Sequence, residues 1–265
     1  MLQSRIQRPI PERLSHYTNI EALKSILSDK EGKGICLWAF SNRHKNDDQE
    51  IRMGEYMLKR ILNSCSFPQE SLLHQFGGYE KTASFSFMEG EVNEHMLEYG
   101  HYRLEFDLRE LGIGLLIDGL IDCEYVPENE LEQYANEYCE MICQTYNSIP
   151  DLQKKQGKYS PLVIDRIGGF LMMELDIIGK VLGLKEQQWS DEREWRKVFQ
   201  LKKDEIYYYE GKPYVKHYLD KHFLTGITVF YKNGGLAEAQ KDADEIRSYI
   251  YERKYKTKVK VELFE

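Results

Sequence analysis

The sequence predicts a mixed α+β fold in which a mostly antiparallel sheet is flanked by helices. Short stretches that alternate between apolar and polar residues, typical of strands, occur in both halves of the chain. Amphipathic helical patterns separate them, which favours an α+β arrangement over an all-β one. A mainly helical block at about 127–188 lies between the strand-rich halves. We therefore expect a single domain over residues 1–265 with a helical insertion at about 127–188.

The first predicted element follows residues 13–18, which include His16, Tyr17 and Thr18. Thr18 or Asn19 can cap a helix there. Apolar residues then recur at helical spacing: Ile20, Leu23, Ile26 and Leu27. Polar side chains just before a helix N-terminus suit a ligand with phosphate and ribose groups. On local grounds alone, an ordinary strand-to-helix turn is the favoured interpretation.

A dense polar loop, residues 41–50, links a predicted short strand to a predicted helix. Asp47 or Asp48 can cap this helix. Asn46, Asp47 and Glu50 suit two roles equally well, which are capping with solvation and lining the acceptor side of a ligand site.

The remaining strands are predicted from alternation and from β-rich runs. In residues 83–88 the alternation places Ser84 and Ser86 on one face, with aromatic residues between them. The other predicted strands are 36–40, 101–108, 115–117, 120–126, 192–199, 207–209, 214–218, 227–231 and 258–264. An Asp-Gly pair at 118–119 predicts a hairpin.

The remaining helices are predicted from apolar stripes. One begins after Pro127, a second covers about 161–182, and a third begins at about 236. A polar break at 148–160 separates the first two.

Composition limits the classes of function. The formal net charge is -8 and the isoelectric point is about 5.5, so a nucleic-acid partner would need a local basic patch. No apolar run reaches membrane-spanning length, and the first residues lack the apolar region of a signal peptide. The cysteines lack regular spacing, and we expect reduced thiols in a cytoplasmic protein rather than disulfides or a zinc site. They are Cys36, Cys65, Cys123, Cys139 and Cys143.

Three separated motifs together resemble the ADP-ribosyltransferase superfamily. They are His16-Tyr17-Thr18, the strand with Ser84 and Ser86, and Glu192-x-Glu194. In that superfamily, the first motif holds NAD, a middle strand has an aromatic-and-hydroxyl pattern, and a late strand carries the catalytic glutamate. The resemblance implies a split antiparallel sheet and NAD as the co-substrate. The gap between Ser86 and Glu194 is long for a compact transferase, and the helical insertion would account for it.

Over nearly its whole length, the chain also resembles a bacterial family of domains of unknown function. Its pattern consists of His-Tyr-Thr, a Leu-Trp strand, Asn-Asp-x-x-Glu, a Phe-Ser strand and Glu-x-Glu-Trp-Arg. This sequence contains these motifs in that order, at 16–18, 37–38, 46–50, 84–86 and 192–196.

The transferase resemblance implies a role for each motif. Breaking the nicotinamide–ribose bond builds positive charge on the sugar, and a carboxylate beneath it stabilises that charge. Glu194 takes this role, and Glu192 positions or deprotonates the acceptor. The implied NAD-binding residues are His16, Tyr17, Thr18, Ser84 and Ser86.

Several functions stay open. The first is a toxin or phage-defence transferase that modifies nucleic acid or protein, with a possible antitoxin or chaperone partner. The second is a non-enzymatic module that binds a nucleotide or a partner. The third, a metal-dependent hydrolase or nuclease using His16, His44, Asp47 and Asp48, lacks a recognisable ligand spacing.

Two local alternatives complete these expectations. Glu194 is also explained as a surface residue paired with Arg196 or a lysine, a contact of little energetic value. Candidates for a basic patch are Arg43, Lys45, Arg52, Lys59 and Arg60.

Overall fold

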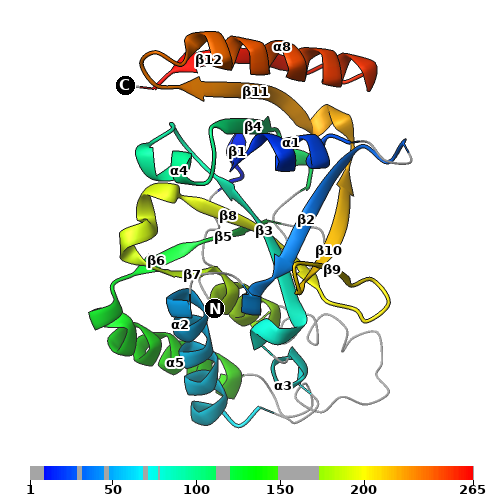
Figure 1. Cartoon of the computed structure of the whole chain (residues 1–265). Helices are drawn as coiled ribbons and strands as arrows, with labels where there is room; N and C mark the ends of the chain where they lie inside the picture. Colours follow the sequence, from blue (N-terminus) through cyan, green and yellow to red (C-terminus); the bar gives the residue numbers. More distant parts are fainter. Residues whose placement is uncertain are drawn as a thin grey trace.

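The structure, a computed structural model, describes residues 9–28, 32–44, 48–67, 71–76, 78–111, 120–148 and 173–264. It is a mixed α+β fold with a large, mostly antiparallel sheet and flanking helices (Figure 1), as predicted. No helix in these ranges combines the length and the apolar character needed to cross a bilayer.

The strands are β1 Leu14–Thr18, β2 Ile35–Ser41, β3 Thr82–Met88, β4 Tyr102–Phe106, β5 Leu120–Asp122, β6 Glu124–Val126, β7 Leu184–Glu186, β8 Glu194–Gln200, β9 Tyr207–Tyr209, β10 Lys212–Leu219, β11 Leu224–Tyr231 and β12 Lys258–Leu263. The α-helices are α1 Ile20–Ile26, α2 Asp48–Ser64, α3 Leu72–Phe76, α4 Glu94–Glu98, α5 Leu131–Ser148 and α8 Leu236–Glu252, and residues 173–183 are also helical. Short 3-10 helices are η2 Asn42–His44, η3 Gly78–Lys81, η4 Arg109–Leu111, η5 Glu128–Glu130, η6 Gln187–Glu192 and η7 Lys221–Phe223.

Strand β3 is the centre of the sheet because it has three partners. Along one edge it pairs with β8 over its full length. Along the other edge, β1 pairs at Met88 and β2 pairs at Ser84 and Ala83. Two strands therefore share one edge and diverge from each other. One arm continues as β1-β4-β11-β12, and the other continues as β2-β10-β9.

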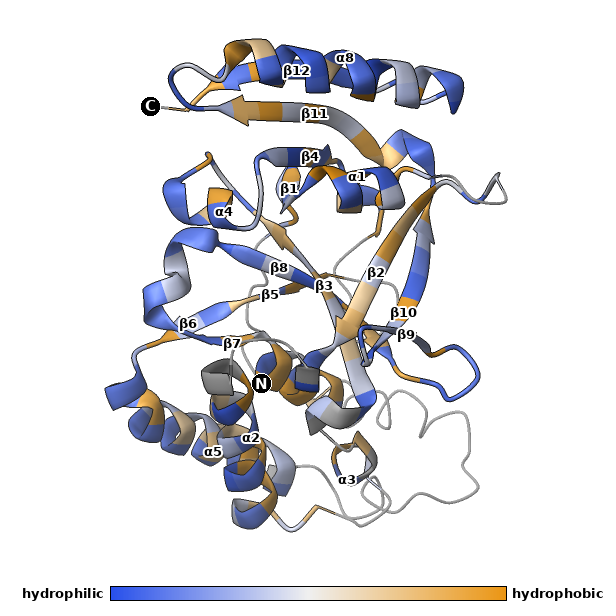
Figure 2. Cartoon of the chain, viewed as in Figure 1, coloured by the Kyte–Doolittle hydropathy of each residue, from blue (hydrophilic) through white to orange (hydrophobic). Residues whose placement is uncertain are grey.

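Apolar side chains form a separate core on each face of β8, and β3 contributes to the first of them. Phe87 and Trp195 belong to the core that α1 and α8 cover, and Val198 belongs to the core beneath α2 and α5. Figure 1 shows α8 at the top along β11 and β12, α1 below them, and α2 and α5 in the lower part of the molecule. In Figure 2, β8 is predominantly hydrophilic although it lies between β3 and β5 inside the sheet.

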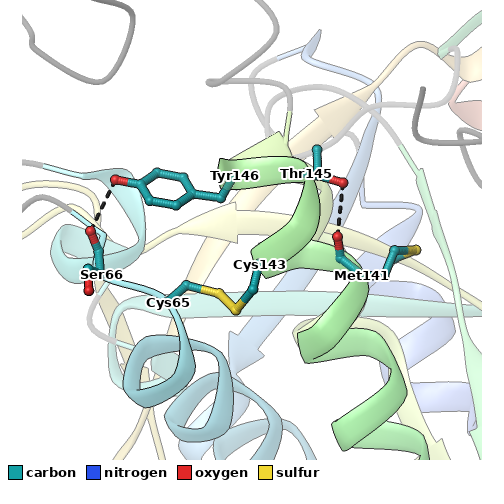
Figure 3. The surroundings of a disulfide bond; sticks show 6 residues. All are labelled: Cys65, Ser66, Met141, Cys143, Thr145 and Tyr146. Atoms are coloured by element: carbon teal, nitrogen blue, oxygen red, sulfur yellow. Dashed lines mark hydrogen bonds between the residues drawn. A yellow bond between two sulfur atoms is a disulfide. The ribbon is translucent and has the colours of Figure 1, made fainter. Parts of the chain in front are cut away.

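The expectation that all cysteines are reduced is wrong for two of them. Cys65, just after α2, forms a disulfide with Cys143 on α5, with their Cα atoms 5.4 Å apart (Figure 3). Packing of α2 on α5 brings together residues that are 78 positions apart, which spacing alone did not reveal. The phenol of Tyr146 donates to the carbonyl of Ser66 at 3.0 Å beside the bond. The three other cysteines are buried and are not part of a disulfide: Cys36, Cys123 and Cys139.

The predicted strand at 120–126 is divided in the structure. Residues 120–122 form β5, which pairs with β8, whereas residues 124–126 form β6, which pairs with β7 in a separate two-stranded sheet. The first strand of the predicted hairpin, 115–117, and most of the predicted helix at 161–182 lie outside the described residues.

Candidate functional site

The three predicted motifs lie on three neighbouring strands. His16 is on β1, Ser84 and Ser86 are on β3, and Glu194 is the first residue of β8. Because adjacent strands lie about 4.8 Å apart, the backbones of His16 and Glu194 are separated by roughly 10 Å. The fold thus brings together residues that are far apart in the sequence.

The His16 side chain lies near the point where β1 and β2 diverge from β3. Its Nδ1 is 3.1 Å from the carbonyl oxygen of Ser86, and its ring centroid is 4.2 Å from that of Phe85. A carbonyl only accepts, so Nδ1 carries the proton and Nε2 presents a lone pair. Burial lowers the pKa of His16 to about 4, although the bond to Ser86 acts in the opposite direction. The imidazole is therefore neutral at pH 7.

The alternation of side chains divides the predicted NAD-binding residues between the two faces of the sheet. Ser15 pairs with Met88, which pairs with Glu194, so these three side chains share one face. Ser84 and Ser86 lie four and two positions before Met88 on β3, so their side chains point to the same face as Met88. The side chains next to Ser15 on β1 point to the opposite face. The structure thus groups Ser84 and Ser86 with Glu194, and it places His16 and Thr18 on the opposite face.

Tyr17 lies on the Glu194 face but is buried in a small apolar cluster with Met88, Met96 and Phe230. Its ring therefore packs against side chains and does not form an open binding wall.

Ser84 is held in a buried hydrogen-bond chain at the start of β3. Its hydroxyl donates to Asn42 Oδ1 at 2.6 Å, and Asn42 Nδ2 donates to Thr82 Oγ1 at 2.9 Å. This chain ties β3 to η2. In the loop that follows, Asn46 and Asp47 lie outside the described residues, and only the helical backbone of Glu50 is described.

The prediction that Glu192 belongs to the same strand as Glu194 is wrong. Arg193 has a φ of 44°, in the left-handed region, so η6 ends at Glu192 and β8 begins at Glu194. The two carboxylates nevertheless meet, because Lys185 on β7 bonds to both. Its Nζ is 2.5 Å from Glu192 Oε2 and 2.7 Å from Glu194 Oε2.

Arg196 completes this buried ionic cluster, defined here as Lys185, Glu192, Glu194 and Arg196. Its Nε and Nη2 bond to the two oxygens of Glu194 at 2.9 and 3.0 Å, and its Nη1 donates to the carbonyl of Leu182 at 2.6 Å. Each of the four residues is at most 5% exposed. The pairing of Glu194 with Arg196 is confirmed, but the contact is buried, whereas the sequence predicts a surface contact.

Opposite charges determine the protonation of Lys185. Loss of hydration, the largest single effect, lowers its pKa, but the charges of Glu194 and Glu192 together raise it well above the usual value. Lys185 therefore stays an ammonium ion, and with Arg196 it balances the two carboxylates.

An aromatic edge connects the buried ionic cluster to the surface. Tyr99, which is 49% exposed, donates its hydroxyl to Glu192 Oε1 at 2.7 Å, and His95 Nε2 lies 3.2 Å from the same oxygen. The Trp189 ring centroid is 4.6 Å from that of His95. The indole N–H of Trp189 is buried and has no hydrogen-bond partner among the described residues.

Sequence reasoning missed Lys185, Trp189, His95 and Tyr99. The first two had a detectable signal, because a lysine, a tryptophan, two glutamates and an arginine occur at intervals of two to four residues in 185–196. His95 and Tyr99 had none, because only the fold brings α4 and its C-terminal end against η6.

The predicted basic patch is partly neutralised. Arg43 and Lys59 both lie within 4.0 Å of Glu55, and Arg60 donates to Asn136. Lys45 lies outside the described residues. Within the described part of the chain, no three His, Cys, Asp or Glu side chains gather as metal ligands.

Comparisons with protein-family models, with curated proteins and with solved structures gave no significant match.

Proposed function

We propose that the protein is an NAD-dependent ADP-ribosyltransferase that modifies a nucleic acid or a protein, as a toxin or defence effector. One observation carries the proposal. The three motifs that resemble this superfamily lie on the adjacent strands β1, β3 and β8, with His16 beside the divergence of β1 and β2.

The residues present suit this chemistry in specific ways. The neutral His16 offers Nε2 as an acceptor for a ribose hydroxyl, but it lies on the sheet face opposite Glu194, so the proposal requires NAD to reach both faces through the divergence of β1 and β2. Glu194 provides negative charge for the sugar cation, and Arg196 fixes the orientation of its carboxylate. Glu194 already contacts both Lys185 and Arg196. Catalysis therefore requires a ribose hydroxyl to replace one of these two partners of the Glu194 carboxylate.

Release of nicotinamide from NAD tests the proposal without knowledge of the acceptor. Purified protein would be incubated with NAD labelled on the adenylate, in separate reactions with cellular protein, RNA and single-stranded DNA, each with a chelator. We expect chelator-resistant nicotinamide release and label transfer to one pool. Glu194→Gln should lower turnover about a hundred- to a thousand-fold, since removal of one such electrostatic contact has this effect. Glu186→Gln, a nearby carboxylate at the end of β7, is the matched control.

A second candidate, a non-enzymatic module that binds a nucleotide or a partner, is favoured by a different observation. Glu192 and Glu194 are almost fully buried, and their bonds to Lys185, Arg196 and Tyr99 already occupy their oxygens. Such carboxylates suit a structural role. In this case wild-type protein releases no nicotinamide, and Glu194→Gln lowers the melting temperature without another effect.

A further inference from the structure

Strands β2, β10 and β9 carry aromatic side chains on the face that points away from the main core. Their register places Phe40 beside Tyr214, and Tyr214 beside Tyr207. The alternate residues of β2 and β10, including Leu37, Ala39 and Val215, point into the core. We call the outer set the aromatic face; it consists of Trp38, Phe40, Tyr207, Tyr209, Tyr214 and Tyr218.

Five rings of the aromatic face, all except Tyr218, form a continuous series of contacts. Trp38 stacks on the buried Tyr214, with centroids 4.7 Å apart and planes inclined by 21°. Tyr207 and Tyr209 flank this pair at 5.6 Å from Tyr214 and 5.8 Å from Trp38. Because Tyr207 and Tyr209 are 47% and 50% exposed, rings that are positioned by their neighbours remain accessible to a ligand.

Lysines accompany these rings on the same face. Lys216 pairs with Trp38 in the register, and its ammonium group lies 4.2 Å from the ring centroid of Tyr207. Lys212 pairs with Tyr209, and the ammonium group of Lys33 lies 5.3 Å from the ring of Tyr218. Between residues 207 and 219, the sequence contains one acidic residue, Glu210 in the turn. This segment, 207–219, therefore carries a net positive charge, although the chain as a whole is acidic.

We propose that the aromatic face binds single-stranded nucleic acid. Exposed aromatic rings on a sheet provide stacking surfaces for unpaired bases, and flanking lysines attract the phosphates. A double helix hides its base faces and would gain only the charge interaction. A sugar polymer also stacks on such rings, but it lacks the negative charge that Lys212 and Lys216 would attract. The proposal does not depend on NAD chemistry, because none of these residues belongs to the buried ionic cluster.

Fluorescence anisotropy tests the proposal with full-length protein. The probes are labelled thymidylate and uridylate oligomers of about 12 nucleotides, a length that such platforms cover. The competitors are unlabelled duplex DNA, heparin and a neutral glucan oligomer. We expect the single-stranded probes to bind, duplex and heparin to compete at least tenfold less well, and the glucan not to compete.

Single substitutions assign the binding to this face. Tyr207→Ala and Tyr209→Ala should each weaken binding about tenfold, at the lower end of the range for loss of a base-stacking ring. Tyr208→Ala is the matched control, because Tyr208 is 71% exposed on the same strand but points to the opposite face. Lys216→Gln should reduce the slope of log affinity against log salt by about 0.7, the value for one phosphate contact.

Several results would overturn the proposal: no binding of either oligomer at low salt, equal competition by heparin or duplex, competition by the glucan, or equal affinities for the three tyrosine variants. All variants should retain the melting temperature of the wild type. If Tyr209→Ala unfolds, Tyr209→Leu, which keeps apolar contacts but removes the stacking ring, replaces it in the comparison.

Discussion

At the scale of single residues, the buried ionic cluster is the main difference between the structure and the sequence-based predictions, because the sequence predicts a surface ion pair at Glu194. Lys185 and Arg196 each contact Glu194, and Lys185 also contacts Glu192, so every charge in the cluster has an opposite neighbour. Removing one member of a buried pair leaves the other uncompensated, which is strongly destabilising. The same glutamates on a surface would contribute little.

Replacement of Lys185 tests this view of the cluster. We expect Lys185→Met to lower the free energy of unfolding by about 3–5 kcal/mol, because Glu192 and Glu194 are left facing each other without an ammonium ion. Since the pKa of Lys185 is raised in the folded protein, its stabilisation is fully present below the unfolded value of 10.5 and is lost only as the pH rises through the folded value. Urea unfolding at pH 7 measures the loss, with the exposed Lys203→Met as the control. A loss equal to that of the control would contradict the prediction.

His16 should make stability depend on pH in the acidic range. The folded pKa of about 4 lies below the ordinary 6.5, so the stabilisation is present above pH 6.5 and lost as the pH falls toward 4. The shift corresponds to about 3 kcal/mol at most. The difference in unfolding free energy between wild type and His16→Gln, measured by urea titration from pH 7 to pH 4, should decrease over this range. A constant difference would show that His16 titrates normally.

At the scale of secondary-structure elements, local patterns predicted most strands and helices but not their partners. Alternation identified β3 and placed Ser84 and Ser86 on one face. It did not reveal that Ser84 bonds to Asn42, because that contact depends on how η2 packs against β3. The alternating pattern also predicted that β8 begins at Glu192. It missed the break at Arg193, because a left-handed backbone conformation at a residue other than glycine has no clear sequence signal.

The junction of α2 and α5 gives a prediction for the disulfide. A bond that closes a loop of 78 residues restricts the unfolded chain, and such bonds typically contribute about 2–4 kcal/mol. We therefore expect a reducing agent, or Cys143→Ser, to lower the free energy of unfolding by about this amount. Chemical unfolding with and without reductant measures it, and mass spectrometry of alkylated protein verifies the redox state. If reductant has the same effect on Cys143→Ser as on the wild type, the effect does not come from this bond.

Close packing between α2 and the helical segment 173–183 gives a second prediction at this scale. A Cβ on Gly54 would lie 2.0 Å from the Tyr79 hydroxyl and 2.6 Å from the Val181 carbonyl oxygen, and these two groups bond to each other at 2.8 Å. Gly54→Ala should therefore destabilise the protein by more than 1 kcal/mol, although alanine is the better helix former. Thermal unfolding tests this prediction, with Tyr79→Phe to isolate the lost hydrogen bond. An alanine variant as stable as the wild type would show that the contact relaxes without cost.

At the scale of the whole molecule, β3 and β8 link the two halves. The class of fold was predictable, because alternating strands and amphipathic helices occur throughout the chain. The three-partner arrangement of β3 was not, since no local pattern states that β1 and β2 share one edge. For the same reason, the placement of His16 on the face opposite Glu194 became visible only with the register.

Because β8 contributes to both apolar cores, with Trp195 in one and Val198 in the other, we expect the described halves to unfold together. Trp195 lies in the core with Phe87, whereas the helices that give the circular dichroism signal belong to both cores, α8 to the first and the disulfide-linked α2 and α5 to the second. Urea transitions followed by tryptophan emission and by helical circular dichroism should coincide, as expected for one cooperative unit. Val198→Ala, in the core beneath α2 and α5, should then shift both signals equally. If part of the helical signal is lost at lower urea than the tryptophan signal, the two cores unfold separately, and the prediction of a single domain over the whole chain is wrong.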